Sequence, residues 1–440
     1  MLQLSKQRLS QDLQYLHDSA CSTIFKEKVT SFSRLRKLSY EDTIFSMLHR
    51  KGLSLSIDIA NYFNLKDDTI MISRQAYVKQ RLNLDPQLFN HLNQFHVRNV
   101  YQMEPNLDKM KGLFLLAVDG SDILVPTTQQ TVEYYGSTSR KGVRPCATAK
   151  LFTIYDALNK FTIYSRLNRN KFSEPTSLKQ GLEEIQDIFR DNEAVVIMDR
   201  NFFSFKMVYH FKTMAKQHFV FRIREKDLKI EKSKMKSQDE IVSIELTQQR
   251  LNMYRNDELY DTLKSMGTME VRIVCFELEN GEIEYLVTDL SEEFTYEDIG
   301  QIYHYRWNIE TSYDTLKNKL KLENFTGKLP HLIEQDVYTT IYLCNIMEDI
   351  IGYAESISSK GQDKKYKYEM KINRNISIGI LKEKLIVMAL EKDKDKQETL
   401  FNEVIDQIQQ QVVPIRPGRK NKRNKDPKKQ KYPMNQKKSY

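Results

Sequence analysis

Apolar positions recur every three to four residues along the first quarter of the chain. Leu9, Leu13 and Leu16 show this spacing, which places apolar side chains on one face of a helix. Strand-like alternation is absent from this stretch. We therefore expect residues 1–105 to form a helical region.

One stretch of this region carries candidate DNA contacts. Ser73 can cap the start of a helix whose polar positions include Arg74, Gln75, Lys79 and Arg81. The connection from the preceding helical segment, SLSIDIANYFNL, is longer than that of an ordinary helix-turn-helix. The pattern alone therefore leaves two interpretations, a DNA-reading helix and an ordinary solvated helix face.

From Leu113 onward the pattern changes to short β-rich runs separated by polar segments. The runs are LFLLAV, LFTIYDALNKFTIYSRL, AVVIMD and HFVFRIR. Stretches with helical spacing, GLEEIQDIFRDNE and FSFKMVYHFKTMAKQ, lie between the later runs. This alternation predicts a mixed α/β sheet with flanking helices.

The alternation of strands and helices is interrupted before the last part of the chain. Two alternating runs near its end are joined by Asn280-Gly281, which predicts a tight hairpin turn. After Phe294 helical spacing returns. The expected parts are a helical region 1–105, a sheet core 106–224, a β-rich insertion 225–291, a second part of the core 292–350, C-terminal helices 351–413 and a tail 414–440.

Composition excludes several classes of protein. With 40% hydrophobic residues among 440, the chain can bury a core and is not disordered throughout. No apolar run is long enough to span a bilayer and the start lacks a signal-peptide pattern. Only 14 glycines are present, without a nucleotide-binding glycine motif. The four cysteines form no C-x-x-C pair, so we expect a soluble intracellular protein without a nucleotide cofactor.

The positive charge is concentrated at the C-terminal end. Residues 414–440 hold eleven basic residues against one acidic residue, a net charge of +10, whereas the whole chain carries +9. Residues 1–413 are therefore close to neutral, at −1. A basic, proline-containing arm of this kind contacts nucleic acid phosphates or simply raises solubility.

Two aspartates end apolar strands: Asp119 closes LFLLAVD and Asp199 closes AVVIMD. Each by itself is an ordinary turn residue. A third carboxylate, Glu310, shares one helical arc of about 60° with Tyr303, Arg306 and Lys317 if the segment is a regular helix. The residues of this arc form either a row of solvent-exposed ion pairs or part of a functional site next to the aspartates.

Three carboxylates on a sheet and an abutting helix can hold two divalent cations about 3.5–4 Å apart, the arrangement that drives phosphoryl displacement. Mg²⁺ suits oxygen ligands of this kind. Arg306 and Lys317 would then neutralise phosphates, and Tyr303 would hydrogen-bond or stack.

These residues resemble the DDE transposases of bacterial insertion sequences. The spacing Y-x2-R-x3-E-x6-K at Tyr303, Arg306, Glu310 and Lys317 is similar to the Y-R-E-K signature of the insertion-sequence-four family. VDGS, MDRNF and YRWNIE add to the resemblance, which covers roughly residues 110–345.

The resemblance implies a ribonuclease-H-like catalytic core with a β-rich insertion, preceded by a helical DNA-binding region and followed by helices and a basic tail. It implies a bacterial, cytoplasmic, nucleoid-associated cut-and-paste transposase. Such an enzyme uses two Mg²⁺ ions, for which Mn²⁺ can substitute. As a homodimer it would cleave double-stranded DNA at terminal inverted repeats, form a hairpin and join the 3′-hydroxyl ends to target DNA.

The resemblance also assigns residues. Asp119, Asp199 and Glu310 would be the catalytic metal ligands, and Tyr303, Arg306 and Lys317 would hold the transposon end around a flipped base. Further positions that resemble DNA contacts are Arg200, Arg222, Arg74 and Lys79, although a structural salt bridge explains Arg200 and Arg222 nearly as well. Because Trp307 is the single tryptophan, no tryptophan of the β-rich insertion can stack on a flipped base. Either another aromatic there, such as Tyr254, Tyr260 or Phe276, takes this place, or the flipped base is handled differently.

Two other functions fit parts of the pattern. The three carboxylates alone would permit a metal-dependent DNA nuclease or resolvase without strand transfer. The basic tail and helical front alone would permit a catalytically silent DNA-binding protein.

Overall fold

The computed structural model describes residues 4–18, 24–28, 30–33, 37–66, 71–139, 145–190, 192–214, 216–278, 281–358 and 367–416. The basic tail lies outside these described residues from position 417 onward. The chain divides into two compact units. Unit 1 comprises Met1–Pro105, Asp122–Ala149 and Tyr313–Tyr440, and unit 2 comprises Asn106–Ser121 and Lys150–Ser312.

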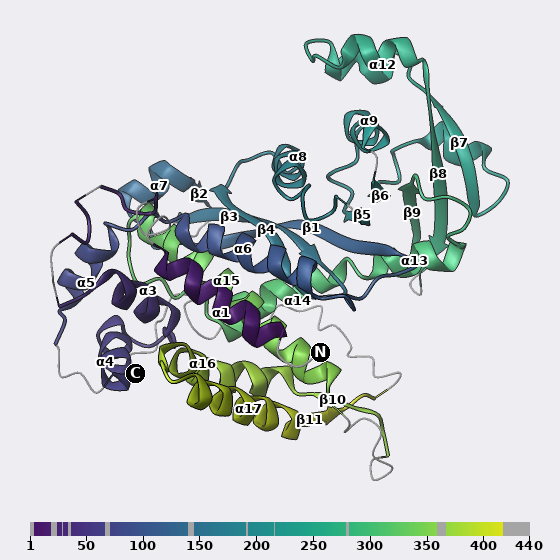
Figure 1. Cartoon of the computed structure of the whole chain (residues 1–440). Coiled ribbons are helices and arrows are strands. Elements are labelled where there is room, and N and C mark those ends of the chain that lie inside the picture. Colours follow the sequence, from purple (N-terminus) through teal and green to yellow (C-terminus); the bar gives the residue numbers. More distant parts are fainter. Residues whose placement is uncertain are drawn as a thin grey trace. The chain divides into compact units, whose positions relative to one another are not determined.

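Unit 1 is built from helices that gather around one long, largely buried helix, α15 (Pro330–Ser356). In Figure 1, α1 and α6 lie along α15, and α16 and α17 follow it. The remaining bounds are α1 (Leu4–His17), α3 (Tyr40–Leu48), α4 (Leu55–Leu65), α5 (Arg74–Arg81), α6 (Leu88–Met103), α7 (Gln129–Tyr135), α16 (Arg374–Leu390) and α17 (Lys394–Gln410), with the strand pair β10 (Met370–Ile372) and β11 (Val412–Pro414). Among the described residues, no helix is both long and apolar enough to cross a membrane.

A buried ion cluster fixes α5 to α15 in unit 1. The Arg81 guanidinium lies 2.8 Å from Asp336, and Arg50 lies 2.7 Å from the same carboxylate. Burial opposes ionisation of Asp336, but the two arginines outweigh it and hold its pKa below the usual value. Arg81 is fully buried, so this residue of the candidate DNA-reading helix anchors the helix and is not available to DNA.

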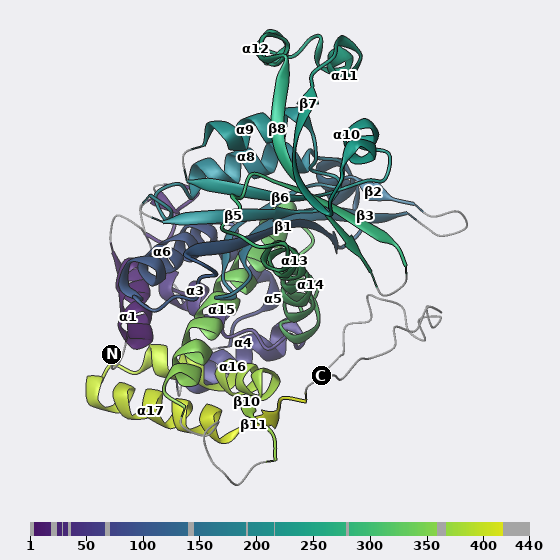
Figure 2. The ribbon, with the colours of Figure 1, turned by 90° about the vertical axis from the view of Figure 1, so that its right-hand side faces the viewer.

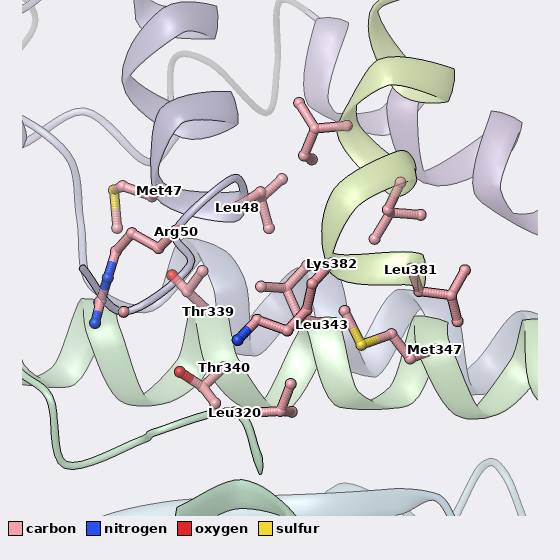
Figure 3. Close-up of a pocket in the computed structure, with 13 residues that line it drawn as sticks. Met47, Leu48, Arg50, Leu320, Thr339, Thr340, Leu343, Met347, Leu381 and Lys382 are labelled. Atoms are coloured by element: carbon pink, nitrogen blue, oxygen red, sulfur yellow. The ribbon is translucent and has the colours of Figure 1, made fainter. Parts of the chain in front are cut away.

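The core of unit 1 is tightly packed where α3, α15 and α16 meet. Figure 3 shows a cavity there, lined by Leu48 of α3, Thr340 of α15 and Leu381 and Lys382 of α16. Its volume is about 20 Å³, which is room for roughly one water molecule. The cavity therefore reflects helix packing and is too small for an organic ligand.

Unit 2 is organised around a mixed sheet. Its strand order is β3-β1-β5-β6-β9-β8-β7, with β4 paired to β3. Strands β1, β5 and β6 are parallel, and β9, β8 and β7 continue the sheet antiparallel. The bounds are β1 (Leu113–Leu124), β3 (Cys146–Asp156), β4 (Thr162–Arg169), β5 (Glu193–Met198), β6 (Gln217–Ile223), β7 (Asp239–Glu245), β8 (Thr268–Glu277) and β9 (Ile283–Thr288).

Helices cover both faces of this sheet. Figure 2 shows α8 (Glu174–Glu184) and α9 (Phe205–Thr213) on one face and α13 (Tyr296–His304) with the start of α14 (Trp307–Asp314) on the other. Coverage on both sides explains why β1 and β5 read as continuous apolar runs. The mixed α/β class expected from the sequence is confirmed, and the strand order β4-β3-β1-β5-β6 is consistent with a ribonuclease-H-like sheet.

The segment between β6 and α13 combines strands and short helices. It contains α10 (Lys229–Lys234), β7, α11 (Gln248–Leu251), a 3₁₀ turn at Asn252–Tyr254, α12 (Tyr260–Met266), β8 and β9. The tight hairpin turn predicted at Asn280-Gly281 falls between β8 and β9. The Leu278 N–H donates to the Glu282 carbonyl over 2.8 Å, and Asn280 lies outside the described residues. Gly281 has φ +78°, a backbone conformation that favours glycine.

Candidate active site

The register of two parallel strands brings the predicted aspartates together. Strand β1 pairs with β5 so that Leu115 lies opposite Val195 and Ala117 opposite Ile197. The same offset places Asp119 level with Asp199. Both aspartates follow the carboxyl ends of the apolar runs, where side chains of parallel strands become exposed at one edge of the sheet.

Asp119 lies in a strongly negative environment. Burial raises the pKa of its carboxyl group, and the charges of Asp199 and Glu310 raise it further. The N–H of Gly120, 2.8 Å from Oδ1, and the charge of Arg306 act in the opposite direction. Asp119 is therefore within electrostatic reach of both other carboxylates predicted from the sequence.

Asp199 is held by a residue that the sequence analysis did not select. Asn201 donates its backbone N–H to Asp199 Oδ1 over 2.7 Å and its side-chain amide to Oδ2 over 3.0 Å. Arg224 in turn donates to the Asn201 side-chain oxygen over 3.0 Å. A polar residue two positions after a strand-end Asp is the usual sign of this side-chain turn, so MDRN contained the signal.

The segment that carries Tyr303, Arg306 and Glu310 is not one regular helix. Helix α13 ends at His304 and α14 begins at Trp307, with the Arg306 N–H bonded to the Tyr303 carbonyl at 3.0 Å. A π-helix follows at Thr315–Lys319. The expected single arc at 100° per residue is therefore wrong, because i→i+3 bonds overwind the chain at the first junction and i→i+5 bonds underwind it at the second.

Arg306 is the cation at the centre of this group. Its guanidinium donates to Glu310 Oε1 over 3.2 Å and lies 5.9 Å from the Tyr303 ring centroid and 5.0 Å from that of Trp307. The residue is only 9% exposed. Its buried Nε has no hydrogen-bond partner among the described residues.

A second arginine and a fourth carboxylate lie beside it. Arg222 of β6 forms an ion pair with Glu284 of β9 at 3.2 Å. Burial raises the pKa of Glu284, whereas the charges of Arg222 and Arg306 lower it. Burial also raises the pKa of Tyr303, which is influenced by Arg306, Glu284 and Arg222. Sequence analysis missed Glu284, although a glutamate inside an otherwise strand-like run was visible.

The other predicted DNA contacts are distributed over both units. Arg200 is exposed at the turn after Asp199. In unit 1, Lys317 donates to the Asp122 carbonyl over 2.6 Å, and Arg74 and Lys79 are exposed on α5. The Ser73 hydroxyl accepts a bond from the Ala76 N–H at 3.2 Å, which confirms the predicted N-cap.

The aromatic side chains of the β-rich segment are engaged in packing. Tyr254 is buried, and the Phe276 ring lies 4.2 Å from that of Tyr296. Tyr260 lies on α12 at the end of the β7–β8 extension (Figure 2). Trp307, by contrast, is 41% exposed beside Arg306.

Pairs of the three predicted carboxylates, rather than all three together, are suited to bind a divalent ion. Within the described part of the chain, no three His, Cys, Asp or Glu residues are arranged to hold a single ion. Mg²⁺, however, is commonly bound by one or two carboxylates together with water and substrate phosphates. The charges of Asp199 and Glu310 both act on Asp119. A bound cation would reduce the repulsion between Asp119 and these two carboxylates.

One family of known proteins matches the part of the chain that carries these carboxylates. Residues 113–346 match the family model described as the transposase DDE domain. No curated protein matches the chain. One solved structure that is similar to the chain is the piggyBac transposase synaptic complex with hairpin DNA, with 13% identity, a TM-score of 0.42, and coverage of 90% of this chain and 82% of that one.

Proposed function

The chain belongs to the transposase DDE domain family, whose model spans more than half of its residues, and we propose that it is a cut-and-paste DNA transposase. It would cleave terminal inverted repeats, pass through a hairpin and join the 3′-hydroxyl ends to target DNA. The bacterial insertion-sequence-four group is the proposed relationship. The observation that carries the proposal is the β1–β5 register, which sets Asp119 beside Asp199 with Glu310 and Arg306 in electrostatic reach.

Each carboxylate has a proposed role as a ligand. Asp119 with Asp199, and Asp119 with Glu310, would hold two Mg²⁺ ions, or Mn²⁺ in their place. The chemistry that such ions supply is activation of the attacking oxygen and neutralisation of charge on the scissile phosphate. Asn201 keeps the Asp199 carboxylate oriented through both of its oxygens.

The cationic residues would bind the DNA backbone. The Arg306 guanidinium would donate to a phosphate oxygen next to the carboxylates, and the Tyr303 hydroxyl would bind a neighbouring phosphate. Lys317, Arg200, Arg222, Arg74 and Lys79 would extend this contact along the transposon end. A homodimer would pair two ends, and the basic tail would add contacts to phosphates that do not depend on sequence.

The first test uses labelled DNA from both flanks of the protein's own gene, with and without Mg²⁺. Wild-type protein should produce nicks and hairpins at discrete ends. Asp119→Asn and Glu310→Gln should abolish cleavage and leave DNA binding largely intact. Asp261→Asn, at an exposed position on α12, is the matched control and should cleave normally.

Three outcomes would contradict parts of the proposal. Cleavage by a folded Asp119→Asn variant would remove that residue from the ligand set. Hydrolysis without any joined product in a strand-transfer assay would indicate a nuclease or resolvase. Binding without cleavage by the wild-type protein in Mg²⁺ and in Mn²⁺ would indicate a catalytically silent DNA-binding protein.

A further inference from the structure

The strand β9 places a carboxylate beside the proposed DNA-binding arginines. In the β6–β9 pair, Arg222 lies opposite Leu286, so Glu284, two residues along β9, points to the same face of the sheet and is the diagonal neighbour of Arg222. The observed 3.2 Å ion pair between Arg222 and Glu284 follows from this register.

The pair is asymmetric in its exposure. The Glu284 side chain is 13% exposed and the Arg222 side chain 34%. The carboxylate is thus held within the protein, while part of the guanidinium faces solvent. Because a guanidinium has five N–H donors, an ion pair with one carboxylate leaves donors on Arg222 for a phosphate.

Glu284 is also within electrostatic reach of the arginine next to the proposed metal ligands. The charges of Arg222 and Arg306 both lower the pKa of Glu284. The charges of Arg306, Glu284 and Arg222 all act on the pKa of Tyr303. Glu284 therefore pairs with one cation, on β6, and feels the charge of a second, at the α13–α14 junction.

We propose that Glu284 is a positioning residue that holds the Arg222 guanidinium in place, so that this group is ordered before DNA binds. The inference rests on the proposed transposase function. A free arginine side chain loses about 0.5–1.5 kcal/mol of conformational freedom when an interface immobilises it. The ion pair meets this cost during folding, and the carboxylate itself makes no contact with DNA because phosphate would repel it.

The test measures end cleavage at varied DNA concentration. Glu284→Gln should raise the KM for the transposon end about three- to tenfold, the range expected for ordering one long side chain. The kcat should stay within about twofold, because the proposed metal ligands are unchanged. Glu284→Asp, which keeps the charge, should recover part of the loss.

A double-mutant cycle separates positioning from a general role in folding. In an Arg222→Ala background, Glu284→Gln should have no further effect on KM, because its partner is gone. Glu277→Gln, at an exposed position on the adjacent strand β8, is the matched control and should leave KM unchanged. Thermal melting of each variant establishes that it is folded.

The outcomes distinguish this inference from the proposed function. If wild-type protein neither binds nor cleaves the ends, the proposed function fails and the inference fails with it. If wild-type protein cleaves, but Glu284→Gln has a wild-type KM, or its effect adds to that of Arg222→Ala, only the positioning role is overturned.

Discussion

The charge of the Asp119 carboxyl group depends on its surroundings. Burial and two neighbouring carboxylates favour its protonated form, so its pKa lies above the ordinary value. A bound divalent cation would favour the ionised form instead. Metal binding and protonation at Asp119 therefore compete.

This competition predicts a pH-dependent stabilisation by metal. Adding Mg²⁺ or Mn²⁺ at neutral pH should raise the melting temperature of wild-type protein. At a metal concentration one hundred times the dissociation constant, the free energy of unfolding should rise by about 2.7 kcal/mol. As the pH falls, Asp119 should take up a proton earlier than an ordinary aspartate, because its pKa is raised, and the stabilisation should disappear. Differential scanning calorimetry across a pH series measures this.

Asp119→Asn is the control for that experiment. It should melt at or above the wild-type temperature without metal, because it removes a buried charge from a negative cluster. It should gain little from added metal at any pH. An equal metal-induced shift in wild-type and Asp119→Asn proteins would show that the ion binds elsewhere.

At the scale of elements, the position of α13 on the sheet depends on a close contact. A Cβ at Gly300 would lie 2.8 Å from the Phe276 ring of β8. That ring packs against Tyr296 with centroids 4.2 Å apart, so it cannot easily move aside. Gly300 therefore allows the helix that leads into Tyr303 and Arg306 to approach β8.

Gly300→Ala should destabilise the protein although alanine favours helices. Overpacking costs about 1–3 kcal/mol, which exceeds the roughly 1 kcal/mol gained in helix propensity. End cleavage should also decrease, because α13 and the Arg306 turn would shift together. Urea unfolding and the cleavage assay measure the two effects.

Gly379 of α16 provides the opposite case. A Cβ there would have no neighbour within 4 Å. Gly379→Ala should therefore stabilise the protein by about 0.4–1 kcal/mol and leave cleavage unchanged. If both alanine variants were stabilised, the close approach of α13 to β8 would be contradicted.

At the scale of the whole molecule, unit 1 is assembled from three separate segments of the chain. The buried cluster of Arg50, Arg81 and Asp336 joins the first segment to the last. Asp336 also accepts a hydrogen bond from the Thr326 N–H at 2.8 Å. This cluster ties residues that are more than 250 positions apart in sequence.

Asp336→Ala should reduce the free energy of unfolding by about 3–5 kcal/mol, because two arginines would remain buried without their counter-ion. At neutral pH the full reduction in the free energy of unfolding should be observed. It should shrink only as the pH falls through the lowered pKa of Asp336, where the wild-type protein loses the same interaction. Urea unfolding at several pH values measures it.

The control is Asp406→Ala, at an exposed position on α17, which should change stability by no more than about 0.5 kcal/mol. Similar losses for the two variants would show that the buried cluster contributes no more than a surface charge.

Local pattern by itself determined several features of this protein. Apolar periodicity predicted the strands β1, β5 and β6 and the helix α9 that precedes β6, because each period records which face of one element is buried. The helical stretch predicted from Gly181 overlaps only the end of α8 (Glu174–Glu184). Strand-end position singled out Asp119 and Asp199, and Ser73 was recognised as a helix cap from its residue type. The family was also recognisable from short motifs around these residues.

Tertiary structure alone decided which of these elements meet. The level placement of Asp119 and Asp199 depends on the β1–β5 register, and the contact between Arg222 and Glu284 depends on that of β6 and β9. The burial of Arg81 depends on α15, a helix far along the chain. Local pattern cannot specify these pairings, because they are selected by the packing of segments that are distant in sequence.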